Sequence, residues 1–123
     1  EIRLSLVGSE MCIRDREGPM PHITISDTMP TAVRALCRDA NASGGLPQSM
    51  LDLLAPESIA DVTRTHIEGG KPTIYSGWDI EQWDVARHDG SRATLYIAGE
   101  GNADGTAISV CTTVEDARRA LGR

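Results

Sequence analysis

The sequence has no phenylalanine and only two tryptophans and two tyrosines among 123 residues. Its three cysteines, at positions 12, 37 and 111, are too few and too far apart for a disulfide framework or a cysteine-based zinc site. No apolar run approaches the ~18 residues that cross a bilayer, and no secretion signal is recognisable. These absences argue against disulfide-rich secreted proteins and helical membrane proteins, so we expect a cytoplasmic protein.

Positive charge is also scarce. Eighteen acidic residues oppose twelve basic ones, which gives a net charge of −6, and Lys71 is the only lysine. Such a chain repels nucleic-acid phosphate at long range and attracts basic surfaces. We therefore expect a basic protein as partner, and neither nucleic acid nor a membrane.

The beginning of the chain differs in character from the rest. Residues 5–15, Ser-Leu-Val-Gly-Ser-Glu-Met-Cys-Ile-Arg-Asp, resemble a translated transposon sequencing adaptor. The resemblance implies that residues 1–16 lie outside the native domain, whose sequence then starts at Glu17, at Met20 or upstream. Three acidic residues and three arginines balance within 1–16, so the net charge belongs to 17–123. A segment of that length predicts one small domain.

The pattern of residues 22–67 predicts a short strand and then three short helices. His22–Ser26 alternates and is rich in β-branched residues, as in strands. Apolar residues at helical spacing form one face of a first helix, at Val33, Leu36, Cys37 and Ala40. Pro47 opens a second helix and Pro56 a third. The inward stripe of the third helix is Ile59, Val62, Thr63, His66 and Ile67.

After Lys71 the period changes from about 3.6 to 2, which predicts strands. Candidate strands separated by glycine-bearing turns cover 73–75, 81–87, 92–98 and 106–111. Thr113 and Asp116 then suit the N-terminus of a last helix. The predicted fold is α+β, with a mostly antiparallel sheet that is a β-meander in the C-terminal half. Three short helices precede it, and we expect these and the C-terminal helix to pack on one face.

The hairpin around Gly90 allows a choice between two loop lengths. A two-residue turn would place Trp83 opposite Tyr96 and mix charge into the apolar face. A three-residue loop, residues 88–90 with Gly90 left-handed, instead places Trp83 opposite Leu95. Gln82, Asp84, Arg92, Thr94 and Tyr96 then share the other face. The three-residue loop separates the two faces and is the one we predict.

Motifs for metal or phosphate binding are incomplete. Glu100, Asn102, Asp104 and Gly105 match early positions of a calcium loop, but Cys111 stands where the bidentate acid belongs. The glycines nearby do not follow a strand into a helix, as phosphate cradles require. We interpret 99–105 as a plain hairpin connection and expect no metal and no cofactor.

Catalytic patterns are equally sparse. No serine stands in a Gly-x-Ser-x-Gly turn, and neither Cys37 nor Cys111 has a neighbouring histidine. His22 and His88 suit exposed positions, whereas His66 lies on the apolar stripe of the predicted third helix. A small enzyme or ligand-binding domain that uses His66 is therefore one alternative, and it predicts a concave pocket containing His66. We assign no catalytic residue.

The leading hypothesis is a small acidic accessory protein that acts through protein–protein interaction, of the kind that bacteria, phages and mobile elements encode. The candidate binding residues are Trp78, Asp79, Asp84 and Tyr96. Trp78, expected in a turn beside acids, suits an interface anchor because an indole supplies large area and one donor. A winged-helix DNA-binding regulator is a further alternative, with the third helix as the reading helix.

Overall fold

The computed structural model describes residues 21–103 and 105–123. Segment 1–16, the candidate starts Glu17 and Met20, and Asp104 of the calcium-like stretch lie outside the described residues. The elements follow in the order α2 (Thr31–Ala42), α3 (Gln48–Leu54), the 3-10 turn η3 (Pro56–Ser58), β1 (Ile59–Gly69), β2 (Trp78–Arg87), β3 (Arg92–Asn102), β4 (Gly105–Cys111) and α4 (Val114–Ala120).

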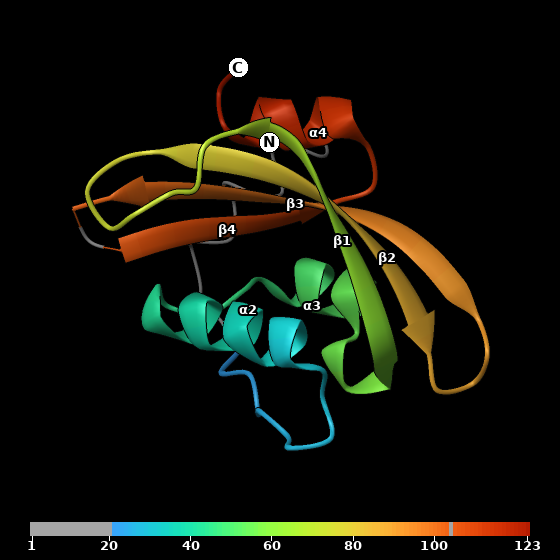
Figure 1. The fold of residues 1–123 in the computed structure, drawn as a ribbon. Coiled ribbons are helices and arrows are strands. Elements are labelled where there is room, and N and C mark those ends of the chain that lie inside the picture. Colours follow the sequence, from blue (N-terminus) through green and yellow to red (C-terminus); the bar gives the residue numbers. More distant parts are fainter. Residues whose placement is uncertain (1–20, 104) are drawn as a thin grey trace, which may run out of the picture.

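The four strands form one antiparallel sheet in the order β1-β2-β3-β4, each strand pairing with its neighbour in sequence (Figure 1). This meander, preceded by helices and followed by α4, confirms the predicted α+β fold. No helix within the described part of the chain is long and apolar enough to span a bilayer.

Helices cover both faces of the sheet, and not one face as expected. The larger cluster joins α2 and α3 to one face, where Trp83, Val85 and Leu95 are buried. The smaller cluster joins Ala117 of α4 to Ile80 on the other face. Figure 1 shows α4 above the sheet and α2 with α3 below it. Helices pack on both faces because successive side chains of a strand point to opposite faces, so neighbouring residues of β2 belong to different clusters.

The predicted third helix is wrong, because Ile59–Gly69 forms strand β1 and only Pro56–Ser58 makes a helical turn. β-branched residues are frequent in this segment and lose side-chain freedom in a helix. Pairing with β2 from one end of β1 to the other, interrupted by two register shifts, supplies backbone hydrogen bonds that the isolated segment lacks. The winged-helix alternative thereby loses its reading helix.

Two of the predicted strands, at residues 22–26 and 73–75, are absent. Residues 22–26 have no regular structure; the side-chain amide of Asn41 instead pairs with Ile23, accepting from its backbone N–H and donating to its C=O at 2.9 Å each. Residues 73–75 belong to the β1–β2 connection, where Thr73 N–H donates to the Ser76 carbonyl at 2.9 Å. We name residues 70–77 the rim loop.

The predicted three-residue hairpin loop is confirmed. Trp83 pairs with Leu95 and Val85 with Ala93, while Gln82 lies opposite Tyr96. Gly90 has a φ of 91°, the left-handed conformation that the bulge requires. The apolar and polar faces of this hairpin are therefore separated, as the two-residue period of its side chains predicted.

Polar side chains fix two helix ends. Thr113 Oγ1 accepts from Asp116 N–H at 3.1 Å, which confirms the predicted cap of α4. Arg87 of β2 donates to the carbonyl of Leu54 at 3.0 Å and to Ser58 Oγ at 2.5 Å, and so satisfies the C-terminal end of α3. Ala55, the residue after α3, adopts a left-handed φ of 43°.

Candidate functional site

A pocket of about 320 Å³ lies between α2 and the sheet, with the rim loop at one end. Its volume is at the lower end of the range for small-ligand sites. Apolar side chains form much of the wall, and the ionisable groups come from four elements. These groups are Asp39 of α2, Arg64 and His66 of β1, Lys71 of the rim loop, and Asp79 and Glu81 of β2.

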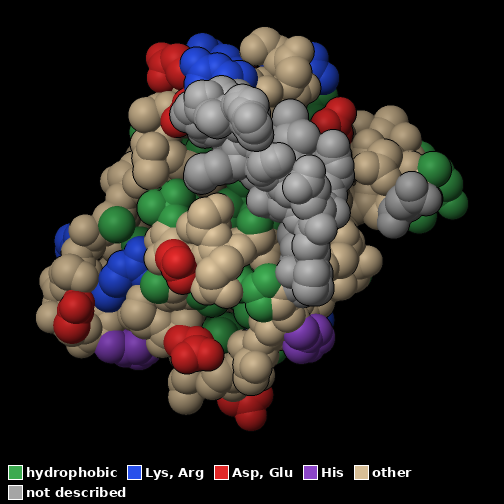
Figure 2. All heavy atoms as spheres, turned by 180° about the vertical axis from the view of Figure 1, so that it is seen from behind, with side chains coloured by type: hydrophobic (Ala, Val, Ile, Leu, Met, Phe, Trp, Pro, Cys, Tyr) green, Lys and Arg blue, Asp and Glu red, His purple; other side chains and the backbone are tan. Residues whose placement is uncertain are grey.

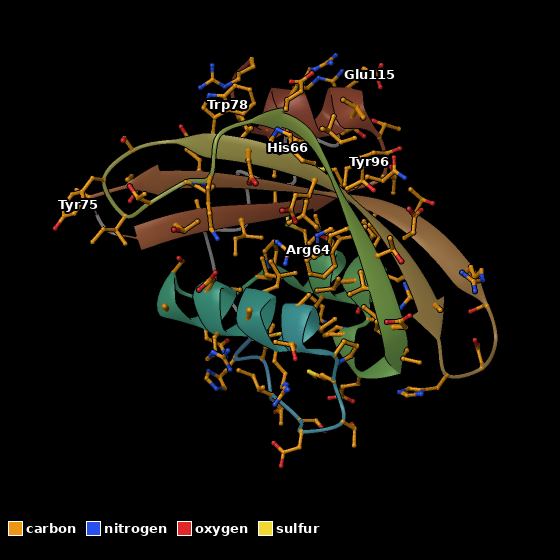
Figure 3. The ribbon with its side chains drawn as sticks, in the orientation of Figure 1. Arg64, His66, Tyr75, Trp78, Tyr96 and Glu115 are labelled. Carbon is orange, nitrogen blue, oxygen red and sulfur yellow. The ribbon has the colours of Figure 1, made fainter. Side chains whose placement is uncertain are left out.

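Glu81 is held on both carboxylate oxygens. Arg64 donates to it through two nitrogens at 2.9 Å each, and the indole N–H of Trp83 donates at 2.9 Å. Burial raises the pKa of Glu81, but the hydrogen bonds from Arg64 and Trp83 outweigh it, so the pKa falls below the ordinary value. Figure 3 shows Arg64 projecting from β1 into the space between the sheet and α2. This network forms one wall of the pocket, and its polar groups are already paired.

Asp79 lies two residues before Glu81 on the same face of β2, and its situation differs. It is half-buried and lines the pocket, yet among the described residues it accepts no hydrogen bond and forms no ion pair. Burial, followed by repulsion from Glu81, raises the pKa of Asp79. Asp79 is therefore a carboxylate that has lost part of its hydration without gaining a partner.

Besides Arg64, which pairs with Glu81, two basic side chains share the pocket with Asp79. His66 and Lys71 both lie near enough to lower its pKa, although less than burial raises it. Neither forms a hydrogen bond or an ion pair with another described residue. His66 is exposed on strand β1, not on a helix as predicted, but it does line a concave pocket.

Glycines at the floor leave space beside Asp79. A Cβ added at Gly99 would lie 3.5 Å from Asp79 Oδ1 and 3.5 Å from Pro72 Cγ, which is ordinary contact. A Cβ at Gly101 would instead lie 1.4 Å from the Thr73 carbonyl oxygen, because the rim loop lies directly on β3. Gly99 thus keeps the pocket open, while Gly101 lets the loop close its end.

The other three candidate binding residues lie on the opposite face of the sheet from Asp79. Trp78 begins β2, and not a turn as expected; it is partly buried, with the Arg123 guanidinium 4.0 Å from its ring centroid. Tyr96 OH donates to Gln82 Oε1 at 3.4 Å. Asp84 accepts from Gln82 Nε2 at 3.0 Å, and hydrogen bonds lower its pKa. Trp78 and Tyr96 lie on the α4 side in Figure 3.

Metal binding and thiol chemistry find little support in the described ranges. No group of three or more His, Cys, Asp or Glu side chains there could hold a metal ion. Cys37 is a buried free thiol, and Cys111 is also buried. Burial raises the pKa of Cys37 to about 11, so its thiolate is scarce at neutral pH. Neither cysteine lines the pocket between α2 and the sheet.

Sequence reasoning found Asp79 and His66 but missed Arg64, Lys71 and Glu81. The signal was present, because the register that places Trp83 inward also places residues 81 and 79 on the core face. Two acidic side chains on a core face need hydrogen-bond or ion-pair partners. Arg64 could not be predicted as one of these partners, because it lies opposite Trp83 only when residues 59–69 form a strand.

Comparisons with protein-family models, with curated proteins and with solved structures find no match to this chain.

Proposed function

We propose that this chain is an acidic binding protein that receives a cationic group of its partner in the pocket between α2 and the sheet. The observation that carries the proposal is the Asp79 carboxylate, which is half-buried, open to the pocket and without a hydrogen-bond or ion-pair partner among the described residues. A guanidinium or ammonium group would supply that partner.

The electrostatics favour a cation at this position. Burial and repulsion from Glu81 raise the free energy of the ionised Asp79 carboxylate. A bound cation offsets both effects with charge-assisted hydrogen bonds, which are about twice as strong as neutral ones. Glu81 cannot play this role, because Arg64 and Trp83 occupy it. Asp39, on the α2 wall, adds a second negative charge that faces the same space.

The pocket walls suit the rest of such a group. Ala35 and Leu36 of α2 face Ile97 of β3 across the pocket. Lysine and arginine carry three or four methylene groups that pack on apolar surface while the charged end reaches a polar partner. An aliphatic cation therefore matches both the apolar walls and Asp79.

The charge of the whole chain acts in the same direction. A net charge of −6 attracts a basic partner over a distance and speeds its association at low salt. Lys71, at the loop end of the pocket, is near Asp79 but does not pair with it. Its long flexible side chain can move aside when a better-positioned cation arrives.

The test is a titration of the isotopically labelled protein with n-butylguanidinium, followed by amide chemical shifts. The matched probe is n-butylurea, which has nearly the same shape and no charge. We expect a dissociation constant near 1 mM, about −4 kcal/mol, for the cation. We expect at least tenfold weaker binding of the urea, with shifts centred on Asp79, Gly99 and Leu36.

Two isosteric variants make the test specific. Asp79→Asn should weaken n-butylguanidinium binding at least tenfold. Asp84→Asn removes a carboxylate from the same strand on the opposite face and should leave binding unchanged. Equal binding of both probes, or equal losses in both variants, would refute the proposal.

A further inference from the structure

We infer that the cationic group belongs to an extended basic peptide segment of a partner protein, which runs from the pocket onto the rim loop and contacts Tyr75 there. The inference rests on the proposed function and adds the class of ligand. It starts from the only two large hydrophobic side chains that are exposed in the described part of the chain, Ile74 at 50% and Tyr75 at 78% exposure.

Both side chains lie on the rim loop, whose residues Lys71 and Pro72 line the pocket. Figure 3 shows Tyr75 at the outer tip of this loop, and Figure 2 shows hydrophobic side chains on the projecting end of the molecule. Single exposed apolar residues are ordinary, whereas adjoining apolar side chains offer the kind of surface that interaction partners cover. Tyrosine is also enriched where interfaces concentrate their binding energy.

The rim loop is held in place by its own hydrogen bonds. Thr73 Oγ1 donates to the Ser76 carbonyl at 3.0 Å and accepts from the N–H groups of Tyr75 and Ser76 at 3.2 Å each. Gly101 N–H of β3 donates to the Gly77 carbonyl at 2.8 Å. The exposed pair is therefore presented on a preorganised loop, which lowers the entropy lost on binding.

The spacing fits a short stretch of polypeptide. Pro72 lines the pocket and Tyr75 follows three residues later, so their Cα atoms lie at most about 11 Å apart. A partner segment can span that distance with three extended residues. An arginine or lysine in the pocket and an apolar residue three positions away would then contact Asp79 and Tyr75 together. A small free cation would leave Tyr75 unused.

The probe is the peptide acetyl-Leu-Ser-Ser-Arg-Ser-Ser-Leu-amide, which places leucine three residues from arginine in both directions. Its control replaces both leucines with serine. Calorimetry should show that the leucine peptide binds at least tenfold more tightly than the control. The double variant Ile74→Ser with Tyr75→Ser should abolish this preference while n-butylguanidinium binding stays unchanged. Tyr75→Phe, which keeps the ring, should retain the preference.

The possible failures are distinguishable. If the double variant binds the leucine peptide as the parent protein does, the inference is wrong and the proposed pocket function survives. If neither peptide nor n-butylguanidinium binds in an Asp79-dependent way, both are wrong. If the protein sediments as a dimer that Tyr75→Ser converts to a monomer, the occupant is a second copy of this chain and the inference is overturned.

Discussion

Replacing either of two glycines on β3 with alanine tests how the pocket is closed. Gly99 and Gly101 lie two residues apart on the same face of the sheet, so the pair differs mainly in surroundings. At Gly99 the nearest heavy atoms are 3.5 Å from an added Cβ, whereas at Gly101 the Thr73 carbonyl oxygen is 1.4 Å away. Alanine fits the first site and collides with backbone at the second.

The expected magnitudes follow from these distances. To restore a contact of 3.4 Å, Thr73 and β3 must separate by roughly 2 Å. That movement breaks the 2.8 Å hydrogen bond from Gly101 to Gly77, which is worth about 1 kcal/mol. Overpacking adds about 1–3 kcal/mol. Gly101→Ala should therefore lower the free energy of unfolding by about 2–4 kcal/mol.

Gly99→Ala should behave differently in both respects. It should leave the free energy of unfolding unchanged or raise it by up to about 1 kcal/mol, because alanine reduces the freedom of the unfolded chain. The added methyl group narrows the pocket beside Asp79, so n-butylguanidinium binding should weaken. Urea denaturation of both variants measures the stabilities. A loss below 0.5 kcal/mol for Gly101→Ala would refute the packing of the rim loop on β3.

Three further outcomes are expected. Ala55→Gly should raise the free energy of unfolding by about 1 kcal/mol, because a left-handed φ of 43° strains alanine and not glycine. Urea denaturation measures the change, and a lower free energy of unfolding would contradict this conformation. Arg87→Met should lower the free energy of unfolding by about 2 kcal/mol, because carbonyls at the end of α3 lose a charged donor. An unchanged midpoint of urea denaturation would show that water replaces Arg87. Calorimetry should show n-butylguanidinium binding weakening as pH falls through the raised pKa of Asp79, because only the ionised carboxylate attracts the cation. The midpoint should lie above 3.8, and a midpoint below it would contradict the burial of Asp79.

The same ionisation affects stability in the opposite sense when no ligand is bound. Because the pKa of Asp79 is raised in the folded protein, the folded state binds its proton more tightly than the unfolded state. The unfavourable contribution of Asp79 is therefore present above its folded pKa and disappears as pH falls below the unfolded value. Asp79→Asn should remove this component from the pH dependence of unfolding.

Local sequence determined the β2–β3 hairpin of this protein. The two-residue period of β2 and β3 allows one register that separates Trp83 and Leu95 from Asp84 and Tyr96, and Gly90 supplies the left-handed residue that this register needs. The apolar face of α2 and the cap at Thr113 were predictable for the same reason. Each depends on residues within one or two turns of one another.

Tertiary structure decided the conformation of β1 and the existence of the pocket. Residues 59–67 fit a helical stripe and a strand almost equally well, and pairing with β2 selects the strand. That strand brings Arg64 and His66 beside Asp79 and Glu81, while α2 covers them from residues more than 20 positions earlier. Burial without a partner, which distinguishes Asp79 from Glu81, depends on all of these elements together. No local sequence pattern predicts this difference between Asp79 and Glu81, because desolvation is a property of the packed surroundings.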